Sequence, residues 1–403
     1  MSGDLASLAG GGTVFASGAR EKLERLRAEL EPLVRRYDVV VANPPYMGSG
    51  SLAKWPSEWV KKQYPDEKSD LCTSFIERGF TLSRADGFNA MVTMQSWMFL
   101  GSYEKMRGKI LRNHMIISMA HLGTRAFGAI GGEVVSTTAT VFGNGTADAD
   151  GVYFRLVDMG SEAEKQEGLL EALADPHCGW FYRANNCGFA AIPGSPIAYW
   201  LSERSAAAFR TSKCGDVFTS VGRTKTHNND MFLRKWWEIS FGDKGTRWHP
   251  YANGGGFSKW AGLESDLVDW STNATKEYES HGGLPNMKRC DDVGICWGLI
   301  TSSKTSFRVK PAHFKYSSGS PTIMSSDPNR EMTTLAFLNS SVSEAYLKAL
   351  NPTLNTTVSD VMSLPCPNTN ESVIATTQEC INLVDIDWEQ YETAWRFKRH
   401  PLT

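Results

Sequence analysis

The first part of the chain alternates between helical and strand-like hydrophobic patterns. Leucines recur at spacings of three and four over residues 18–36, which predicts an amphipathic helix. The β-branched run YDVVVA at 37–42 predicts a fully buried parallel strand that ends at two prolines. Residues Trp55 and Trp59 then fall in a predicted loop. The same patterns predict further helices near 70–83 and at 102–113, and strands at 88–94, 115–122 and 134–142. This alternation is typical of an α/β fold with a mostly parallel sheet.

The pattern changes near residue 145, where NGTADADG reads as a turn-rich connector. Beyond about residue 190 the sequence is rich in Gly, Ser, Asn and Trp, with short strand-like runs at 248–260 and 295–309 and a helical period at 333–350. We therefore expect a second, mixed α/β domain. The expected segments are a leader and helix at 1–36, a first α/β domain at 37–145, a connector at 146–189, a second domain at 190–365 and a helical tail at 366–403.

Composition narrows the class of protein. The 403 residues are 41% hydrophobic and 21% charged, which excludes wholesale disorder. No apolar run approaches the ~20 residues that span a bilayer, and no secretory signal is visible. The eight cysteines form no CxxC pair, and the spacing of His177, Cys178 and Cys187 fits no zinc pattern, so we expect no metal site and a reduced, cytoplasmic protein. A net charge of −2 leaves a nucleic-acid partner open, because a local basic groove is enough to neutralise phosphates.

The strongest chemical signal is Asn43-Pro44-Pro45-Tyr46, directly after the predicted buried strand. An amine on an aromatic ring is a poor nucleophile, because its lone pair is delocalised into the ring. Acceptors on its two N–H bonds favour the nucleophilic form, and the Asn43 side-chain oxygen and the Pro44 carbonyl can supply them. Proline fixes the backbone, and Tyr46 can stack on the ring. The carboxyl end of a parallel strand is where open α/β sheets bind ligands. The alternative is an ordinary proline-terminated strand.

The tetrapeptide resembles the catalytic motif of S-adenosylmethionine-dependent methyltransferases that modify planar amino groups. Such motifs serve adenine in DNA, guanine in ribosomal RNA and glutamine in proteins, and the following sequence distinguishes these substrates. The stretch DLCTSFIERGF resembles the segment that in adenine-specific enzymes lines the cofactor, which assigns Asp70 and Phe75 to cofactor binding. The stretch HLGTRAFGAIGGEVV resembles the loop whose aromatic residue stacks on the flipped adenine, which places Phe127 opposite Tyr46. Without the resemblance, Asp70 caps a helix, and Phe75 and Phe127 are core residues.

Longer blocks resemble one family more closely. VVANPPYMGSG, GFNAMVTMQSWMFL, IGGEVVSTTATVF and LNPTLNTTVSDVMSLP are similar to the large adenine-specific methyltransferases of bacterial BREX phage-defence systems, the PglX type. The resemblance implies a site-specific DNA adenine N6-methyltransferase that uses S-adenosylmethionine on double-stranded DNA. It also implies a partial Rossmann-like methyltransferase sheet, followed by a mixed α/β target-recognition domain.

The resemblance has one important departure. In the family the main cofactor loop lies upstream of the Asn-Pro-Pro-Tyr block, but only 42 residues precede Asn43 here. We expect an internal or split piece that works with a complementing N-terminal half or other phage-defence subunits. The alternative is a catalytically incomplete DNA-binding module.

In the family the region after the catalytic half recognises the target. Here the loop SVGRTKTHNNDMFLRKWW gathers basic and amide side chains that suit phosphate and base contacts. The candidate DNA-binding residues are Arg223, Lys225, Asn228, Asn229 and Arg234, with His227 beside them. The alternative is a solvated loop. A protein-glutamine methyltransferase has no use for a second domain of this size.

Overall fold

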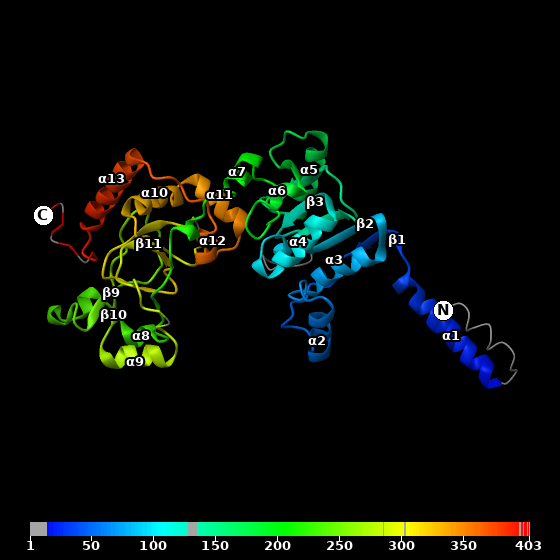
Figure 1. Ribbon diagram of the computed structural model, residues 1–403, viewed down its shortest axis with the longest axis horizontal. Coiled ribbons are helices and arrows are strands. Elements are labelled where there is room, and N and C mark those ends of the chain that lie inside the picture. Colours follow the sequence, from blue (N-terminus) through cyan, green and yellow to red (C-terminus); the bar gives the residue numbers. More distant parts are fainter. Residues whose placement is uncertain are drawn as a thin grey trace. The chain divides into compact units, whose positions relative to one another are not determined.

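The computed structural model describes residues 14–127, 135–284, 286–301, 304–394, 396–397, 399–400 and 402. The chain divides into two compact units, Met1–Cys187 (unit 1) and Gly188–Thr403 (unit 2), which are described separately (Figure 1). The start of the predicted leader, residues 1–13, lies outside the described residues. No helix in the described ranges is long and apolar enough to cross a membrane.

Unit 1 is built on a six-stranded sheet in the order β1-β2-β4-β3-β5-β6. Its strands are β1 Tyr37–Ala42, β2 Ser83–Met94, β3 Met115–Gly123, β4 Thr137–Gly143, β5 Asp150–Arg155 and β6 Phe181–Asn185. The pairings β1–β2 and β3–β5 are parallel, whereas β4 runs antiparallel to both β2 and β3, and β6 is antiparallel to β5. The predicted strands and the α/β class are confirmed, but the sheet is mixed rather than mostly parallel. Four strands, β1, β2, β3 and β5, point the same way.

The helices of unit 1 are α1 Val14–Val34, α2 Lys54–Gln63, α3 Leu71–Leu82, α4 Glu104–Asn113 and α5 Glu162–Ala174, with 3-10 turns η2 Gln95–Met98 and η3 Gly101–Tyr103. The three predicted helices are confirmed. The prediction of a loop around Trp55 and Trp59 is wrong, because both residues lie in α2. Pro56 is tolerated there, since it sits in the first turn, where backbone N–H groups have no intrahelical partner.

Strand β1 is an edge strand of the sheet in the described part of the chain, and the prediction that it is fully buried is wrong. The side chain of Val39 is 53% exposed and that of Val41 is 74% exposed. A β-branched run therefore predicted the strand but not what covers it.

The two faces of the sheet differ. On one face α3 packs closely against β2, where the buried Asn89 donates from Nδ2 to the carbonyl of Ile76 at 3.0 Å. A Cβ at Gly79 would overlap with the Asn89 side chain, so the glycine permits this approach. The opposite face carries an open apolar hollow of about 340 Å³. Its lining includes Val41 on β1, Val92 on β2, Val141 on β4 and Leu173 on α5.

Residues 146–189, expected to be a connector, carry β5, α5 and β6 and so extend the first sheet. Phe154 and Leu156 form a small core with Ala172 of α5. The short helix α6, Asn186–Phe189, begins in the last residues of unit 1 and continues into the first residues of unit 2.

Unit 2 contains a five-stranded sheet, β7-β13-β9-β10-β8, and a three-stranded sheet, β12-β11-β14. The strands are β7 Arg223–Thr224, β8 Leu233–Lys235, β9 Trp248–Ala252, β10 Asp266–Asp269, β11 Gly294–Trp297, β12 Phe307–Lys310, β13 Lys315–Ser317 and β14 Thr322–Ile323. The helices are α7 Glu203–Ala208, α8 Asn229–Phe232, α9 Thr272–Ser280, α10 Pro328–Leu338, α11 Ser341–Leu350, α12 Val358–Met362 and α13 Glu371–Trp388. The predicted mixed α/β character of this region is confirmed.

The single helix predicted at 333–350 is instead two helices, α10 and α11. They are separated at Asn339, whose side chain makes two hydrogen bonds to the backbone of Phe307 on β12. Ser340 then caps α11 by accepting from the N–H of Ser343. Hydrogen bonds to a distant strand thus end a helix that periodicity alone would continue.

Candidate active site and recognition surface

The Asn43–Tyr46 motif leaves the carboxyl end of β1, as the sequence predicts. Because β1, β2 and β3 point the same way, the segments that follow them emerge at one edge of the sheet. Gln95–Met98 follows β2, and residues 124–127 follow β3. The chain topology therefore brings segments far apart in the sequence to this edge of the sheet.

Within the motif, Pro44 is buried, Asn43 is exposed and Tyr46 is half-buried. The Tyr46 hydroxyl donates to Oδ1 of Asn43 at 2.9 Å, and also lies 3.4 Å from the carbonyl oxygen of Val92. Burial, with a smaller contribution from Cys72, raises the pKa of Tyr46 to about 12, so the phenol stays protonated and remains a donor at neutral pH. An amide oxygen has two lone pairs, so Asn43 Oδ1 can accept a second hydrogen bond from a substrate amine.

Asp70 connects the motif to α3. Its Oδ1 caps the helix by accepting from Cys72 N–H at 2.9 Å, and it also accepts from Met47 N–H at 3.2 Å. The N–H of Leu71 donates to the Met47 carbonyl at 2.9 Å. The residue after Tyr46 is therefore fixed to the start of α3. Phe75, one turn further along α3, is 38% exposed and so has an accessible ring.

A buried histidine bonded to a half-buried glutamine at the same edge carries no sequence signal. His121, near the end of β3, is 3% exposed, and its Nε2 lies 2.7 Å from Oε1 of Gln95. Burial, helped by the charges of Arg155 and Lys165, lowers the pKa of His121 to about 3. The neutral ring donates to Gln95 and fixes that side chain. Sequence reasoning missed this pair, because His121 looks like one more position in a strand.

Phe127 is half-buried and lies four residues beyond the end of β3. The chain that follows it, residues 128–134, is outside the described residues. The proposed pairing of Phe127 with Tyr46 stays a prediction, although both follow strands whose carboxyl ends share one edge.

In unit 2, the predicted recognition loop presents a row of basic side chains. Arg223, Lys225 and His227 are exposed, whereas the intervening Thr224 and Thr226 are buried. Strand β7 covers Arg223–Thr224, and the backbone turns at His227, whose φ is 59°. The side chains of Arg223 and Lys225 are exposed on the same side of this segment and are available for a ligand.

The other predicted recognition residues make contacts within the loop. Asn228 caps α8 by accepting from the N–H of Met231, and Asn229 Oδ1 accepts from the Thr226 hydroxyl. Arg234 donates from Nη1 to the carbonyls of Asp230 and Leu233, at 2.8 and 2.6 Å. Its guanidinium also lies 5.8 Å from the centre of the Trp248 ring. These side chains hold the loop in shape.

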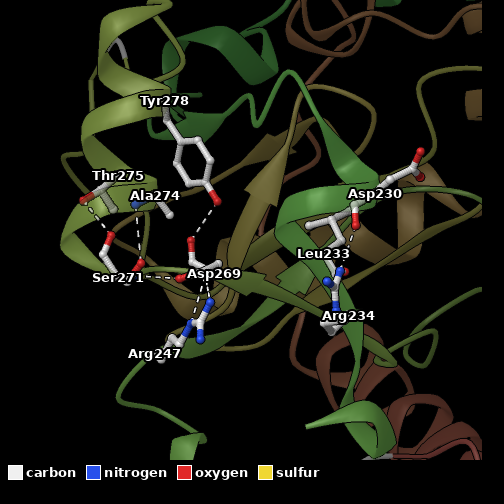
Figure 2. A network of polar contacts seen from close by, with 9 residues as sticks. All are labelled: Asp230, Leu233, Arg234, Arg247, Asp269, Ser271, Ala274, Thr275 and Tyr278. Carbon is white, nitrogen blue, oxygen red and sulfur yellow. Dashed lines mark hydrogen bonds and ion pairs between the residues drawn. The ribbon is translucent and has the colours of Figure 1, made fainter.

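The strands beneath this loop are fixed by a polar network around Asp269 (Figure 2). Asp269 Oδ2 accepts from Nε and Nη2 of Arg247 at 2.9 and 2.7 Å, and Oδ1 accepts from the N–H of Ser271. Burial alone would raise the pKa of Asp269, but the hydrogen bonds from Arg247 and Ser271 bring it below its usual value. The Tyr278 hydroxyl donates to the Asp269 carbonyl, so strand β10 is joined to helix α9. The carboxylate is thus charged and paired.

Known proteins resemble the chain in sequence. Residues 19–127 match the family model of the Eco57I restriction-modification methylase. The adenine-specific methyltransferase PglX of Lacticaseibacillus casei (strain Zhang) is 35% identical over 93% of this chain, which corresponds to 34% of that protein. The adenine-specific methyltransferase BrxX of Escherichia coli O9:H4 (strain HS) is 36% identical over 92% of this chain and 31% of its own length. The chain thus spans about a third of these curated relatives.

Solved structures show a similar fold. The type IIL restriction-modification enzyme MmeI, in complex with DNA, aligns with 89% of this chain and half of its own at a TM-score of 0.57 and 10% identity. The type ISP enzyme LlaGI, in complex with a DNA substrate mimic, aligns with 89% of this chain and 42% of its own at a TM-score of 0.51 and 9% identity. The resemblance predicted from the sequence is confirmed: nearly the whole chain is homologous to one segment of the PglX and BrxX adenine-specific methyltransferases.

Proposed function

We propose that this chain is the amine-binding and target-recognition part of a DNA adenine N6-methyltransferase that acts in phage defence in the cytoplasm. The observation that carries the proposal is the Asn43–Tyr46 motif at the carboxyl end of β1, with Asn43 Oδ1 held by the Tyr46 hydroxyl at 2.9 Å. The naming of PglX and BrxX as adenine-specific methyltransferases and the DNA bound to MmeI support the choice of substrate.

The chemistry requires the amine to be oriented and made nucleophilic. In the proposed complex the flipped adenine donates its two N6–H bonds to Asn43 Oδ1 and the Pro44 carbonyl. Tyr46 covers the ring, and Phe127 covers its other face. Acceptors fixed before the reaction lower the barrier, because they require no reorganisation as charge develops on the amine. The Tyr46 hydroxyl assists by fixing the Asn43 amide, so that its oxygen faces the substrate.

S-adenosylmethionine supplies the methyl group when it is bound. This chain offers only part of a pocket for it. Phe75 presents an exposed ring that can lie against the adenine of the cofactor. Asp70 already accepts two backbone hydrogen bonds. Its role in cofactor binding is therefore to fix the backbone at Met47 and Leu71, rather than to bind the cofactor by itself.

We further propose that the edge of β1 and the apolar hollow beside it accept the remaining part of the methyltransferase domain. Edge strands present unpaired N–H and C=O groups, and the exposed side chains of Val39 and Val41 lie on the same face of this edge strand. A parallel strand added beside β1, with helices over Val92 and Val141, would cover both features. A complementing N-terminal part of a longer protein, or a separate subunit, fits this description. Its absence would leave the alternative function, a DNA-binding module without catalysis.

Substitution of Asn43 in the complete enzyme tests the catalytic proposal. Asn43→Ala should reduce transfer of a labelled methyl group to DNA by ~10²–10³-fold, because one fixed acceptor is removed. Affinity for DNA should be nearly unchanged, because Asn43 makes little contact with the duplex. Near-normal methylation by Asn43→Ala would show that this motif does not bind the amine.

A further inference from the structure

We propose that the exposed face of helix α2 is a DNA-contacting surface beside the site from which the adenine is flipped. This face is formed by Trp55, Trp59 and Lys62, with Lys54 and Lys61 at its margins; we call it the α2 face. The inference rests on the proposed function, since it names a second contact with the same substrate.

The first observation is where α2 is attached. The backbone of Gly48 pairs with that of Asp70, and the N–H of Ser49 donates to the Ser69 carbonyl at 3.0 Å. The segment 49–69 is therefore closed at its base, and α2 projects from that base, away from the sheet of unit 1 (Figure 1). The base lies two residues beyond Tyr46. Any duplex that delivers a base to Tyr46 must pass close to this projection.

The second observation is the exposure of two large aromatic rings. Trp55 is 73% exposed and Trp59 is 46% exposed. Being four residues apart, they lie on the same side of the helix, and Lys62 continues that side. Ser57 and Val60 are the buried residues of α2 and face the other way. Trp59 makes one edge-to-face contact, with Tyr64 at 5.8 Å between ring centres, but neither tryptophan is among the buried core residues. Exposed aromatic surface of this kind indicates a partner.

The third observation is the charge of the α2 face. Lys54, Lys61 and Lys62 have no ion-pair partner among the residues that the structure describes, and Glu58 is the single acidic residue of the helix. Lys109 of α4 offsets part of the nearby acidic charge, because its Nζ lies 3.9 Å from Asp66, 2.9 Å from Glu67 and 3.5 Å from Glu77. Helix α2 itself, with three lysines and one glutamate, is positive as well as aromatic. That combination favours a polyanion with flat apolar groups, which is DNA, over an apolar protein segment.

Base flipping requires contacts of the kind that the α2 face offers. When an adenine leaves the duplex, the neighbouring bases lose a stacking partner and the backbone is distorted. Proteins that deform DNA place apolar side chains against the opened step and basic side chains against the phosphates. On the α2 face, Trp55 and Trp59 supply the first kind of contact and the lysines supply the second.

Two paired variants of the whole chain test the proposal. The first measurement is fluorescence anisotropy with a labelled duplex of mixed sequence over a range of salt. Trp55→Ala/Trp59→Ala should weaken binding about tenfold or more with an unchanged salt slope, because aromatic contacts release no counterions. Lys61→Ala/Lys62→Ala should instead lower the slope of log Kd against log salt by up to ~0.9 for each phosphate that is no longer neutralised. The matched control is Leu30→Ala/Leu33→Ala on α1, which removes exposed apolar side chains from unit 1, each 55% exposed, and should change neither quantity.

Oxidative footprinting provides the second measurement and does not depend on a variant that folds. Bound DNA should protect Trp55 and Trp59 of the unmodified chain from hydroxyl radicals, whereas heparin, a polyanion without bases, should protect them less. Unchanged oxidation in bound complexes, together with normal affinity of the tryptophan variant, would overturn the proposal and assign the α2 face to another partner, such as a protein segment. Failure of the unmodified chain to bind any duplex would instead overturn the proposed DNA function itself.

Discussion

The hydroxyl of Tyr46 donates a 2.9 Å hydrogen bond to the side-chain oxygen of Asn43, three residues earlier in the same motif. One residue of the motif, Tyr46, therefore positions the side chain of another, Asn43. The tyrosine that is expected to stack on the target base also fixes the acceptor that is expected to hold the base's amine. These two roles can be separated by substitution.

In the complete enzyme, Tyr46→Phe should keep the stacking ring and remove the hydrogen bond to Asn43. We expect kcat for methyl transfer to fall by about fivefold, which corresponds to one neutral hydrogen bond of about 1 kcal/mol, with little change in base retention. Tyr46→Ala should in addition weaken retention of the flipped base by ~1–3 kcal/mol. The fluorescence of 2-aminopurine at the target position measures retention, and methyl incorporation measures transfer. Equal effects of Phe and Ala would contradict the separation of roles.

This chain alone should bind S-adenosylmethionine weakly or not at all, because the 42 residues before Asn43 do not supply the expected strand, Gly-rich turn and acidic residue in order. Titration calorimetry of the purified chain measures this directly. The complete protein is the control and should give a stoichiometric heat. A tight heat from the chain alone would show that its own residues form the whole cofactor pocket.

Arg223 and Arg234 should contribute to DNA binding in different ways. Arg223 is exposed, so Arg223→Ala should remove a phosphate contact and lower the salt slope by ~0.9. Arg234 is bound to two carbonyls, so Arg234→Ala should loosen the recognition loop and also lower the melting temperature of unit 2. Anisotropy and thermal unfolding of both variants distinguish the two effects. If neither substitution changes the affinity, the DNA-facing surface lies elsewhere in the chain.

Stability should fall in mild acid through His121. Its folded pKa of about 3 lies below the ordinary value of about 6.5, so the folded state keeps the ring neutral while the unfolded state takes up a proton. The contribution is fully present above pH 6.5 and disappears as the pH falls toward 3, at about 1.4 kcal/mol per pH unit. Urea unfolding at several pH values should show a smaller pH dependence for His121→Gln than for the unmodified chain. Parallel pH profiles would argue against a buried neutral histidine.

The Arg247–Asp269 ion pair should contribute to the stability of unit 2. Asp269 is 4% exposed, so Arg247→Met would leave a buried carboxylate without its charged partner. We expect a loss of about 1–3 kcal/mol in unfolding free energy at neutral pH. The double variant Arg247→Met/Asp269→Asn should recover part of that loss, because no charge then remains buried. If the double variant recovers none of the lost unfolding free energy, packing of the Arg247 side chain, and not its charge, stabilises α9 and β10.

The sequence predicted those features that local chemistry determines. The Asn43–Tyr46 motif, the strand before it and the helix capped by Asp70 follow from proline geometry, β-branching and capping preference, and all lie where expected. The basic row at Arg223 and Lys225 was also visible, because charged residues clustered in one loop.

Features that depend on distant parts of the chain could not be predicted in this way. The exposure of β1 depends on which segments lie beside it in the sheet, and a run of valines does not predict those neighbours. The break at Asn339 depends on hydrogen bonds to Phe307, on another strand. The pairing of His121 with Gln95 joins the ends of two strands that are separated along the sheet by β4. Helix α2 was not predicted, although its proline lies in the first turn, where a helix tolerates it.

The open edge of β1 also has a consequence for anyone who produces this chain by itself. A strand with a free row of backbone donors and acceptors, flanked by exposed valines, is a template for the same strand in another copy. Concentrated preparations should therefore self-associate edge to edge. A charged residue in place of Val39 or Val41 should keep the chain monomeric. It should also prevent the proposed pairing of β1 with the remaining part of the methyltransferase domain.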